Sequence, residues 1–262
     1  MGVDWIVCLA NSYKHDHRCV AGINLTTKKW VRLVGREVPG CVTVQEASYA
    51  NGKPVAPLDL FEVELGDGCG SCSHPEDTYI TSKKWKFIRR FDQPEEHKIL
   101  VSLCSKSASI FQSYEDRIYG KKFEHAEAVT SLELLQSDDL WWWVREENGK
   151  RKNRALFRMG RAGRARYDLA VTDPVWLEQL SLLPAGVYPH AMFCGKEPEK
   201  PLLVISLSEP FQGFHYKLVA GVVQLSGVQK TVPVPGFIRA AKPAAQEARP
   251  HRFHFRWHAR HS

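Results

Sequence analysis

The sequence predicts a mainly β protein with short helices, arranged as two consecutive small β-barrels. Short runs rich in β-branched and aromatic residues recur along the chain, and polar turns with Gly, Pro or Asn separate them. Apolar residues at helical spacing are confined to a few short segments. A parallel βαβ sheet would need a helix after every strand, so it does not fit this pattern. Two β-rich modules, each with about five strands and a short helix, therefore predict small Greek-key barrels.

The first module is expected over residues 1–93, and it begins with three consecutive strands. The runs that predict them are "WIVCLA", "CVAGINL" and "WVRLV", with the polar turn "TTKK" between the second and the third. After a stretch punctuated by Gly and Pro, "LDLFEVEL" alternates apolar and polar residues as a half-buried strand does. The loop "GDGCGSCSHPED" then leads to a final strand in "TYITSKKWKFIRRF". In this last strand, alternation predicts that Lys84, Lys86 and Arg90 are exposed together.

Residues 94–130 are expected to connect the two modules through one or two helices. Pro94 is followed by two glutamates and by apolar residues at roughly helical spacing, as at a helix start.

The second module is expected over residues 131–228. Its first four strands are predicted at 131–135, 140–146, 152–159 and 166–171. The Asn-Gly pair in "ENGK" is typical of a hairpin turn. "TDPVWLEQLSLLP" predicts a short helix capped by Thr172 or Asp173, with Pro at its first position. "PLLVISLSEPF" and "HYKLVAGVVQL" close the module as strands, and residues 229–262 are expected to form a basic, flexible tail.

The positive charge of the chain is concentrated at one end. The formal net charge is +7, but the segment from residue 231 onward carries +5 of it, so the preceding part is nearly neutral. Global charge therefore does not indicate a nucleic-acid partner, and only local basic clusters can do so.

Cysteine usage and hydropathy indicate the compartment. Seven cysteines at irregular spacing do not make a disulfide framework, which favours a reducing cytoplasm. No apolar run reaches the ~18 residues of a membrane-spanning helix, and the N-terminus has no signal-peptide pattern. We therefore expect a cytoplasmic protein with no membrane partner.

Four sequence blocks together resemble a known family. They are "CLANSYKHDHRCVAG", "WVRLV", "YDLAVTDPVW" and "PLLVISLSEPF" with the following "YKLVA". In order and spacing they resemble the prokaryotic dual OB-containing domain, from residue 4 to about residue 223. The resemblance implies two consecutive OB-like barrels and nucleic-acid binding, in some members within anti-phage or other conflict systems. "CGSC" and the tail do not belong to the family pattern, so neither inherits a role from it.

The polar segment "NSYKHDHR" joins the first two predicted strands. In an OB barrel this loop commonly borders the ligand face. Lys14 and Arg18 supply cations for phosphates, and Asn11 and Ser12 can hydrogen-bond a base edge or a sugar. The alternative is a solvated hairpin in which Asn11 and Ser12 bond the local backbone. These four residues, together with Arg32 on the third strand, are candidate nucleic-acid contacts.

The strongest basic cluster is "KRKNRALFRMGRAGRAR" at 150–166, which contains no acid. If its middle part is a strand, Arg154 and Arg158 share one face, opposite Ala155, Phe157 and Met159. Three tryptophans at 141–143 lie on the preceding strand, and aromatic rings beside cations suit single-stranded nucleic acid. The candidate contacts of this cluster and of the basic strand at 83–90 are Trp142, Arg154, Arg158, Arg164, Arg166, Lys84 and Lys86. The alternative is that the tryptophans are core residues and that the cations are merely solvated.

No set of residues makes a convincing catalytic centre. Cys8 lies in an apolar run, and neighbours in one exposed loop rarely assemble a triad. Cys69 and Cys72 form one CxxC pair with His74 nearby, which is half of a zinc site, so these three are weak metal candidates. No cofactor is required.

The sequence thus favours a nucleic-acid-binding protein over an enzyme, with single-stranded or structured RNA or DNA as its partner. Two alternatives stay open. One is a non-catalytic adaptor that holds a partner effector protein. The other is a metal-dependent nuclease or nucleotide hydrolase, whose turnover would need an added divalent metal ion.

Overall fold

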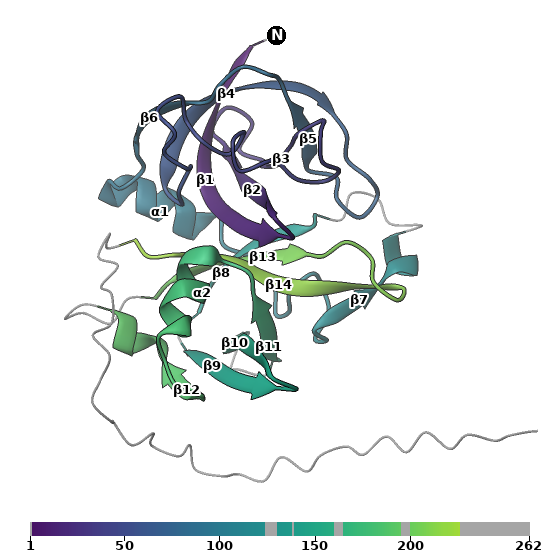
Figure 1. Ribbon diagram of the computed structural model, residues 1–262, viewed down its shortest axis with the longest axis vertical. Helices are drawn as coiled ribbons and strands as arrows, with labels where there is room; N and C mark the ends of the chain where they lie inside the picture. Colours follow the sequence, from purple (N-terminus) through teal and green to yellow (C-terminus); the bar gives the residue numbers. More distant parts are fainter. Residues whose placement is uncertain (1, 124–129, 138, 160–164, 195–199, 226–262) are drawn as a thin grey trace, which may run out of the picture.

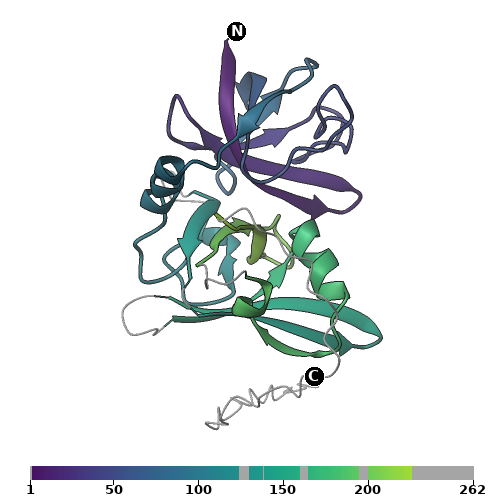
Figure 2. The same cartoon turned by 90° about the vertical axis from the view of Figure 1, so that its left-hand side faces the viewer.

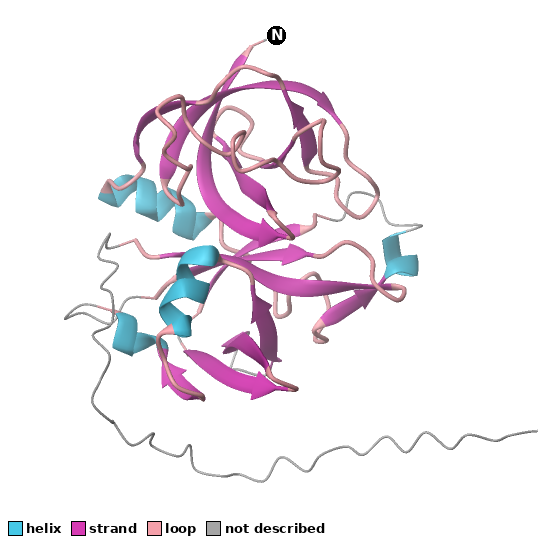
Figure 3. Ribbon diagram, in the orientation of Figure 1, coloured by secondary structure: helices cyan, strands magenta, loops and turns pink. Residues whose placement is uncertain are grey.

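The computed structural model describes residues 2–123, 130–137, 139–159, 165–194 and 200–225 (Figure 1). Strands dominate this part of the chain, and its helices are short (Figure 3). The strands form two barrels, the N-terminal one above the C-terminal one in Figure 1. The expected fold class, mainly β with two OB-like barrels, is confirmed. The predicted tail at 229–262 and the candidate contact Arg164 lie outside the described residues.

The first barrel closes through its long first strand. Its strands are β1 (Val3–Lys14), β2 (His17–Asn24), β3 (Trp30–Val34), β4 (Asp59–Gly68), β5 (Asp77–Ile80) and β6 (Lys86–Arg90). The first half of β1 pairs with β4 and its second half with β2, so the order β1-β2-β3-β5-β4 returns to β1. Strands β3 and β5 are parallel. This arrangement is the five-stranded Greek-key barrel of an OB fold.

The second barrel repeats this topology with a divided first strand. Its strands are β8 (Leu132–Gln136), β9 (Leu140–Glu147), β10 (Lys150–Met159), β11 (Ala165–Val171), β13 (Leu202–Leu207) and β14 (Phe214–Val223). Strand β8 pairs with β13, and the next strand, β9, pairs with β10. Together β8 and β9 therefore take the place of β1. The parallel β11–β14 pair corresponds to the β3–β5 pair. Two short strands, β7 (Arg117–Tyr119) and β12 (Gly186–Pro189), extend the sheet beside β14 and β9.

The two α-helices begin where the sequence predicts them. In α2 (Pro174–Ser181), Asp173 Oδ1 accepts hydrogen bonds from the backbone N–H groups of Val175 and Trp176, at 2.9 and 3.2 Å. Such a cap satisfies donors that have no partner inside the helix. The connector holds α1 (Pro94–Ser102) and then turns, β7 and a 3-10 helix at Gly120–Phe123. None of the helices in the described segments is long and apolar enough to cross a membrane.

Each barrel has its own aromatic core. In the first, the rings of Phe61 and Trp85 stack with centroids 5.1 Å apart. In the second, Trp142 and Trp176 stack with centroids 4.5 Å apart. Burying one such side chain contributes about 1.5–3 kcal/mol, so these rings are major sources of stability.

A third apolar cluster joins the two barrels. Strands β1 and β2 turn Val7, Leu9 and Ile23 away from their own core. These side chains pack on residues of β8 and β13 that point out of the second barrel, such as Leu134 and Val204. Figure 2 shows β1 and β2 directly above the second barrel. The outer surface of β1 and β2 is therefore covered by the second barrel.

The backbones of the two barrels also come close together. A Cβ atom at Gly221 of β14 would lie 2.4 Å from the carbonyl oxygen of Leu9, so only glycine fits there. Nearby, the backbone N–H of Tyr13 donates to the carbonyl of Thr172 at 3.0 Å. These contacts place the β1–β2 turn of the first barrel beside the second barrel.

Candidate functional site

Arg32 links the two barrels instead of facing solvent. Its side chain is almost fully buried, and its guanidinium lies 3.2 Å from Asp77 Oδ1 in the same barrel. It also donates to the hydroxyls of Ser131 and Ser206 in the other barrel, at 2.7 and 3.4 Å. Arg32 was a candidate nucleic-acid contact, but these partners and its burial leave it unable to reach a strand on the surface. Arg32 is buried because the second barrel docks over it, and local sequence patterns do not reveal this docking.

A cavity of about 550 Å³ opens at the end of the interface between the barrels. Its walls come from the β1–β2 hairpin and β3 of the first barrel and from the β13–β14 hairpin of the second. His74, from the β4–β5 loop, adds a further wall. In OB barrels the loops β1–β2 and β4–β5 border the ligand-binding face. The second barrel covers most of this face of the first barrel, and the cavity is the part that stays open.

Lys14 is the cation at the mouth of this cavity. Its Nζ lies 3.0 Å from Glu209 Oε1, which comes from the β13–β14 loop, and donates to the carbonyl of Gly40 at 3.1 Å. Burial is the largest single influence on the pKa of Glu209 and works to raise it, but the hydrogen bond from Lys14 and the positive charges around it together outweigh burial and leave that pKa below its usual value. The two barrels therefore meet here in an ion pair whose carboxylate carries charge at neutral pH.

The predicted loop is instead the paired ends of β1 and β2 with a short turn between them, and its other candidates divide into structural and accessible residues. Asn11 is buried, and its Nδ2 donates to the carbonyl of Val55 at 2.8 Å, so it holds the fold together, although its partner is not the local backbone of a solvated hairpin. Ser12 is also buried but lines the cavity. The guanidinium of Arg18 lies 4.3 Å from the ring centroid of Tyr13, within cation–π range. Tyr13 itself is about half exposed and lines the cavity.

The second barrel presents a basic and aromatic sheet surface, which we call the β9–β11 face. Cross-strand register places Trp143 opposite Arg154, and Trp141 opposite Leu156. Ala155 alternates with them and is buried, so the other side chains point outward. The residues of the β9–β11 face are Trp141, Trp143, Arg145, Lys152, Arg154, Leu156, Arg158, Arg166 and Asp168. The first barrel does not cover it, because that barrel packs on β8, β13 and β14.

Ion pairs fix some cations of the β9–β11 face. Arg154 Nε lies 2.6 Å from Asp168 Oδ1, and Arg158 Nε lies 3.3 Å from Asp139 Oδ2. The guanidinium of Arg145 lies 4.4 Å from the ring centroid of Trp143. Within the described residues we find no ion pair for Lys152 or Arg166, and both are exposed. The face thus combines two half-buried indole rings with cations that differ in how strongly they are already held.

Trp142 is not a surface residue, although it was a candidate contact. It is fully buried, stacks on Trp176, and donates from Nε1 to His190 Nδ1 at 3.2 Å. It cannot stack on a base while the barrel is folded. Its neighbours Trp141 and Trp143 point outward instead, and strand alternation with buried Val144 carries the signal that separates them.

The basic strand β6 departs from simple alternation. The guanidinium of Arg90 lies 2.6 Å from Oδ1 of the buried Asp59, and Phe87 is partly exposed. The irregular pairing of β6 with β4 between Leu60 and Phe61 shifts the faces, so Arg90 does not share a face with Lys86 as alternation predicted, although its side chain is still 41% exposed. Lys84 and Lys86 are exposed, but Lys84 donates to the carbonyl of Gln45 at 2.9 Å, and Lys86 lies 3.4 Å from Glu62.

The weak metal candidates do not come together as a ligand set. His74 is buried, with Nε2 3.2 Å from the carbonyl of Leu207, and burial lowers its pKa to about 4. Cys69 and Cys72 have no third His, Cys, Asp or Glu placed to complete a metal site among the described residues. Cys8 is buried, and desolvation raises the pKa of its thiol far above neutral, which makes it a poor nucleophile.

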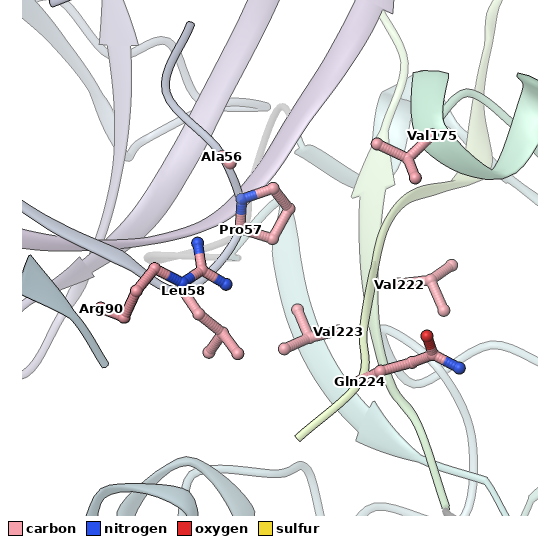
Figure 4. A pocket seen from close by; sticks show the side chains of 8 residues that line it. All are labelled: Ala56, Pro57, Leu58, Arg90, Val175, Val222, Val223 and Gln224. Carbon is pink, nitrogen blue, oxygen red and sulfur yellow. The ribbon is translucent and has the colours of Figure 1, made fainter. Parts of the chain in front are cut away.

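A smaller cavity, of about 220 Å³, lies elsewhere between the barrels (Figure 4). Its lining is mostly apolar, with Pro57 and Leu58 from one barrel and Val222 and Val223 from the other. Among the described residues Arg90 is the one charged residue that lines it, and Asp59 already pairs with it. The described residues of this cavity therefore offer no free charged group to a ligand.

The match to a family model agrees with the two-barrel architecture. The sequence model of a family described as the dual OB-containing domain matches residues 5–222. A crystal structure of the tetrameric p202 HIN2 shares 9% sequence identity and a TM-score of 0.28, covering 85% of this chain and 92% of that one. So low a TM-score carries no argument about this chain. No curated protein matches the sequence.

Proposed function

This chain belongs to the dual OB-containing domain family, and from that premise we propose that it binds single-stranded nucleic acid on the β9–β11 face. The observation that carries the proposal is the pair of outward-facing rings, Trp141 and Trp143, with Arg154 and Leu156 directly opposite them on β10. Stacking platforms beside cations are what a single strand requires, because its bases offer flat faces and its phosphates offer charge.

The position of the β9–β11 face within the barrel supports the proposal. In OB barrels, oligonucleotides lie across the second and third strands, which here are β10 and β11. In the first barrel the outer surface next to the corresponding strands is covered, and its Arg32 is bound by Ser131 of the second barrel. The two barrels are therefore not equivalent, and the open face of the second one is the place for an extended strand.

The proposal is tested by fluorescence polarisation with labelled single- and double-stranded DNA and RNA at several salt concentrations. Trp141→Ala with Trp143→Ala should weaken single-strand binding by about tenfold or more, since stacking contributes about 1–3 kcal/mol per base. Lys83→Ala is the matched control, because Lys83 is an exposed cation on the other barrel. Binding at low salt that both variants leave unchanged would place the contact elsewhere. No binding at all would overturn the proposal and favour the adaptor alternative.

The proposal extends to the cellular role of the protein. We infer that the protein acts in the cytoplasm of a prokaryote, within an anti-phage or other conflict system, as the family resemblance implies. Phage challenge of cells that carry the intact locus or the Trp141→Ala/Trp143→Ala variant tests this. Equal survival of the two strains would separate the defence role from the β9–β11 face. Catalysis is tested with the same oligonucleotides and added Mg²⁺, Mn²⁺ or Zn²⁺, where appearance of cleavage products would favour the nuclease alternative.

A further inference from the structure

We propose that the 550 Å³ cavity between the barrels is a separate site for one nucleotide unit, an aromatic base with a phosphate. The site goes beyond the proposed strand binding, because none of the residues of the β9–β11 face lines it. Its volume lies within the range of about 300–1,000 Å³ that is typical of small-ligand pockets. The unit is either a free nucleotide or the terminal nucleotide of a strand.

The wall on the second barrel suits a base. Phe211 and Tyr216 line it with ring centroids 6.5 Å apart, and Leu218 adds an aliphatic surface. Phe211 is 61% exposed, which is unusual for a phenylalanine in a loop that otherwise packs against another barrel. Tyr13 lies on the other side of the cavity and is also exposed. An aromatic base is a ligand that would cover these rings from both barrels.

The mouth of the cavity suits a phosphate. Lys14 Nζ already binds one anion there, the carboxylate of Glu209, and Glu209 stands on an exposed loop. A phosphate carries more charge than a carboxylate and presents more acceptor oxygens, so it competes effectively for the same ammonium group. Glu209 therefore acts as an internal substitute for the phosphate, and it turns away when the nucleotide enters.

Buried groups behind the mouth add polar partners. Ser12 and Ser206 line the cavity, and both are buried. Arg32 lines it as well, and its Nε is a buried donor for which we find no hydrogen-bond partner within the described residues. Arg32 is paired with Asp77 and Lys14 with Glu209, so the cavity favours an anionic ligand once Glu209 turns away and leaves Lys14 without its carboxylate.

The test measures affinities by isothermal titration calorimetry of the full chain. The ligands are AMP, ATP and oligonucleotides that do or do not carry a 5′-phosphate. Lys14→Met should weaken binding by about tenfold or more, the size of one charge-assisted hydrogen bond. Glu209→Gln should tighten it by about two- to fivefold, because it removes the competing carboxylate. Loss of binding by Lys14→Met could result from misfolding, but tighter binding by Glu209→Gln could not, so the second variant keeps the test decisive. Lys83→Met and Glu64→Gln, from an ion pair of the first barrel that does not line the cavity, are the matched controls and should change nothing.

The rate of cysteine alkylation is an independent measure of ligand binding at the same site. Cys19 lines the cavity, whereas Cys72 is exposed and does not line it. Bound nucleotide should slow alkylation of Cys19 by iodoacetamide and leave Cys72 unchanged, as measured by mass spectrometry of peptides. Protection by AMP or ATP identifies a free nucleotide, and protection only by 5′-phosphorylated strands identifies a strand end. Absence of binding up to millimolar ligand in both the native chain and Glu209→Gln would overturn the proposal. So would binding that Lys14→Met leaves intact.

Discussion

Arg32 and Ser131 belong to different barrels, and the guanidinium of Arg32 donates a 2.7 Å hydrogen bond to the hydroxyl of Ser131. Ser131 in turn donates from its backbone N–H and its hydroxyl to Glu76 of the first barrel, at 2.7 and 2.8 Å. This buried polar network lies beside the apolar cluster that joins the barrels. It gives the two barrels a defined orientation, because hydrogen bonds are directional whereas apolar contacts alone are not.

Arg32→Met should destabilise the protein by about 3–5 kcal/mol, because it leaves the buried carboxylate of Asp77 without its cation. Urea denaturation followed by tryptophan fluorescence measures the change. Arg32→Met combined with Asp77→Leu should recover most of the loss, since no buried charge is then left unpaired. Arg36→Met is the control, because Arg36 is exposed. If Arg32→Met costs no more than this control, the network contributes little to folding.

Trp142→Ala and Trp143→Ala should separate stability from binding, although the residues are adjacent. Trp142 is fully buried and stacked on Trp176, so its removal should lower the free energy of unfolding by about 3–5 kcal/mol. Trp143 is only partly buried, and its removal should cost markedly less stability but weaken single-strand binding. Equilibrium unfolding and polarisation on the same two variants measure both effects. Equal losses of stability would contradict the assignment of the two faces of β9.

His190 should make the stability of the second barrel depend on pH. Burial lowers its pKa from 6.5 to about 4, so the folded protein keeps it neutral where the unfolded chain takes up a proton. Its contribution to stability is therefore lost as the pH falls from about 6.5 to about 4, and amounts to about 3 kcal/mol. Protonation of Nδ1 would also break the hydrogen bond from Trp142.

His190→Asn isolates this effect. The amide oxygen of Asn can still accept from Trp142, but it does not titrate in this range. Burial raises the pKa of Asp77 and of Asp173 to about 6, so both carboxyls act in the opposite direction over part of the same window. They are present in both proteins, and the difference between the two unfolding curves removes them. Parallel pH profiles for the native chain and His190→Asn would show that His190 titrates normally.

Alternation along strands predicted some of the side chains correctly and others not. On β10 it placed Ala155 and Phe157 inside and Arg158 outside, because that strand pairs regularly on both sides. It failed for Arg90 on β6, where an irregular pairing with β4 shifts the register. Sequence patterns of period two contain no information about such an irregularity.

Contacts between the barrels were beyond local pattern analysis. Lys14 and Glu209 form an ion pair although 195 positions separate them in the chain. The cavity they border therefore exists only once both barrels have folded and docked. The sequence singled out Lys14 as part of a predicted loop between the first two strands, but nothing near Glu209 marked it as the partner. Likewise, the sequence predicted Arg32 as a surface cation, but the second barrel docks on the side of the first barrel where Arg32 lies, and Arg32 is buried.

The cations of the β9–β11 face should contribute unequally to nucleic-acid binding. Lys152 and Arg166 are exposed without an ion pair in the described part of the chain, whereas Asp168 holds Arg154 at 2.6 Å. A phosphate can use a free cation at once, but it must compete with a carboxylate for a paired one. Lys152→Ala and Arg166→Ala should each reduce the slope of log K against log salt by about 0.7, and Arg154→Ala should reduce it less. Polarisation titrations at four or more salt concentrations measure the slopes, with Lys83→Ala as the control. A larger reduction for Arg154→Ala than for the other two would mean that the strand displaces Asp168 and binds directly over the Trp143–Arg154 pair.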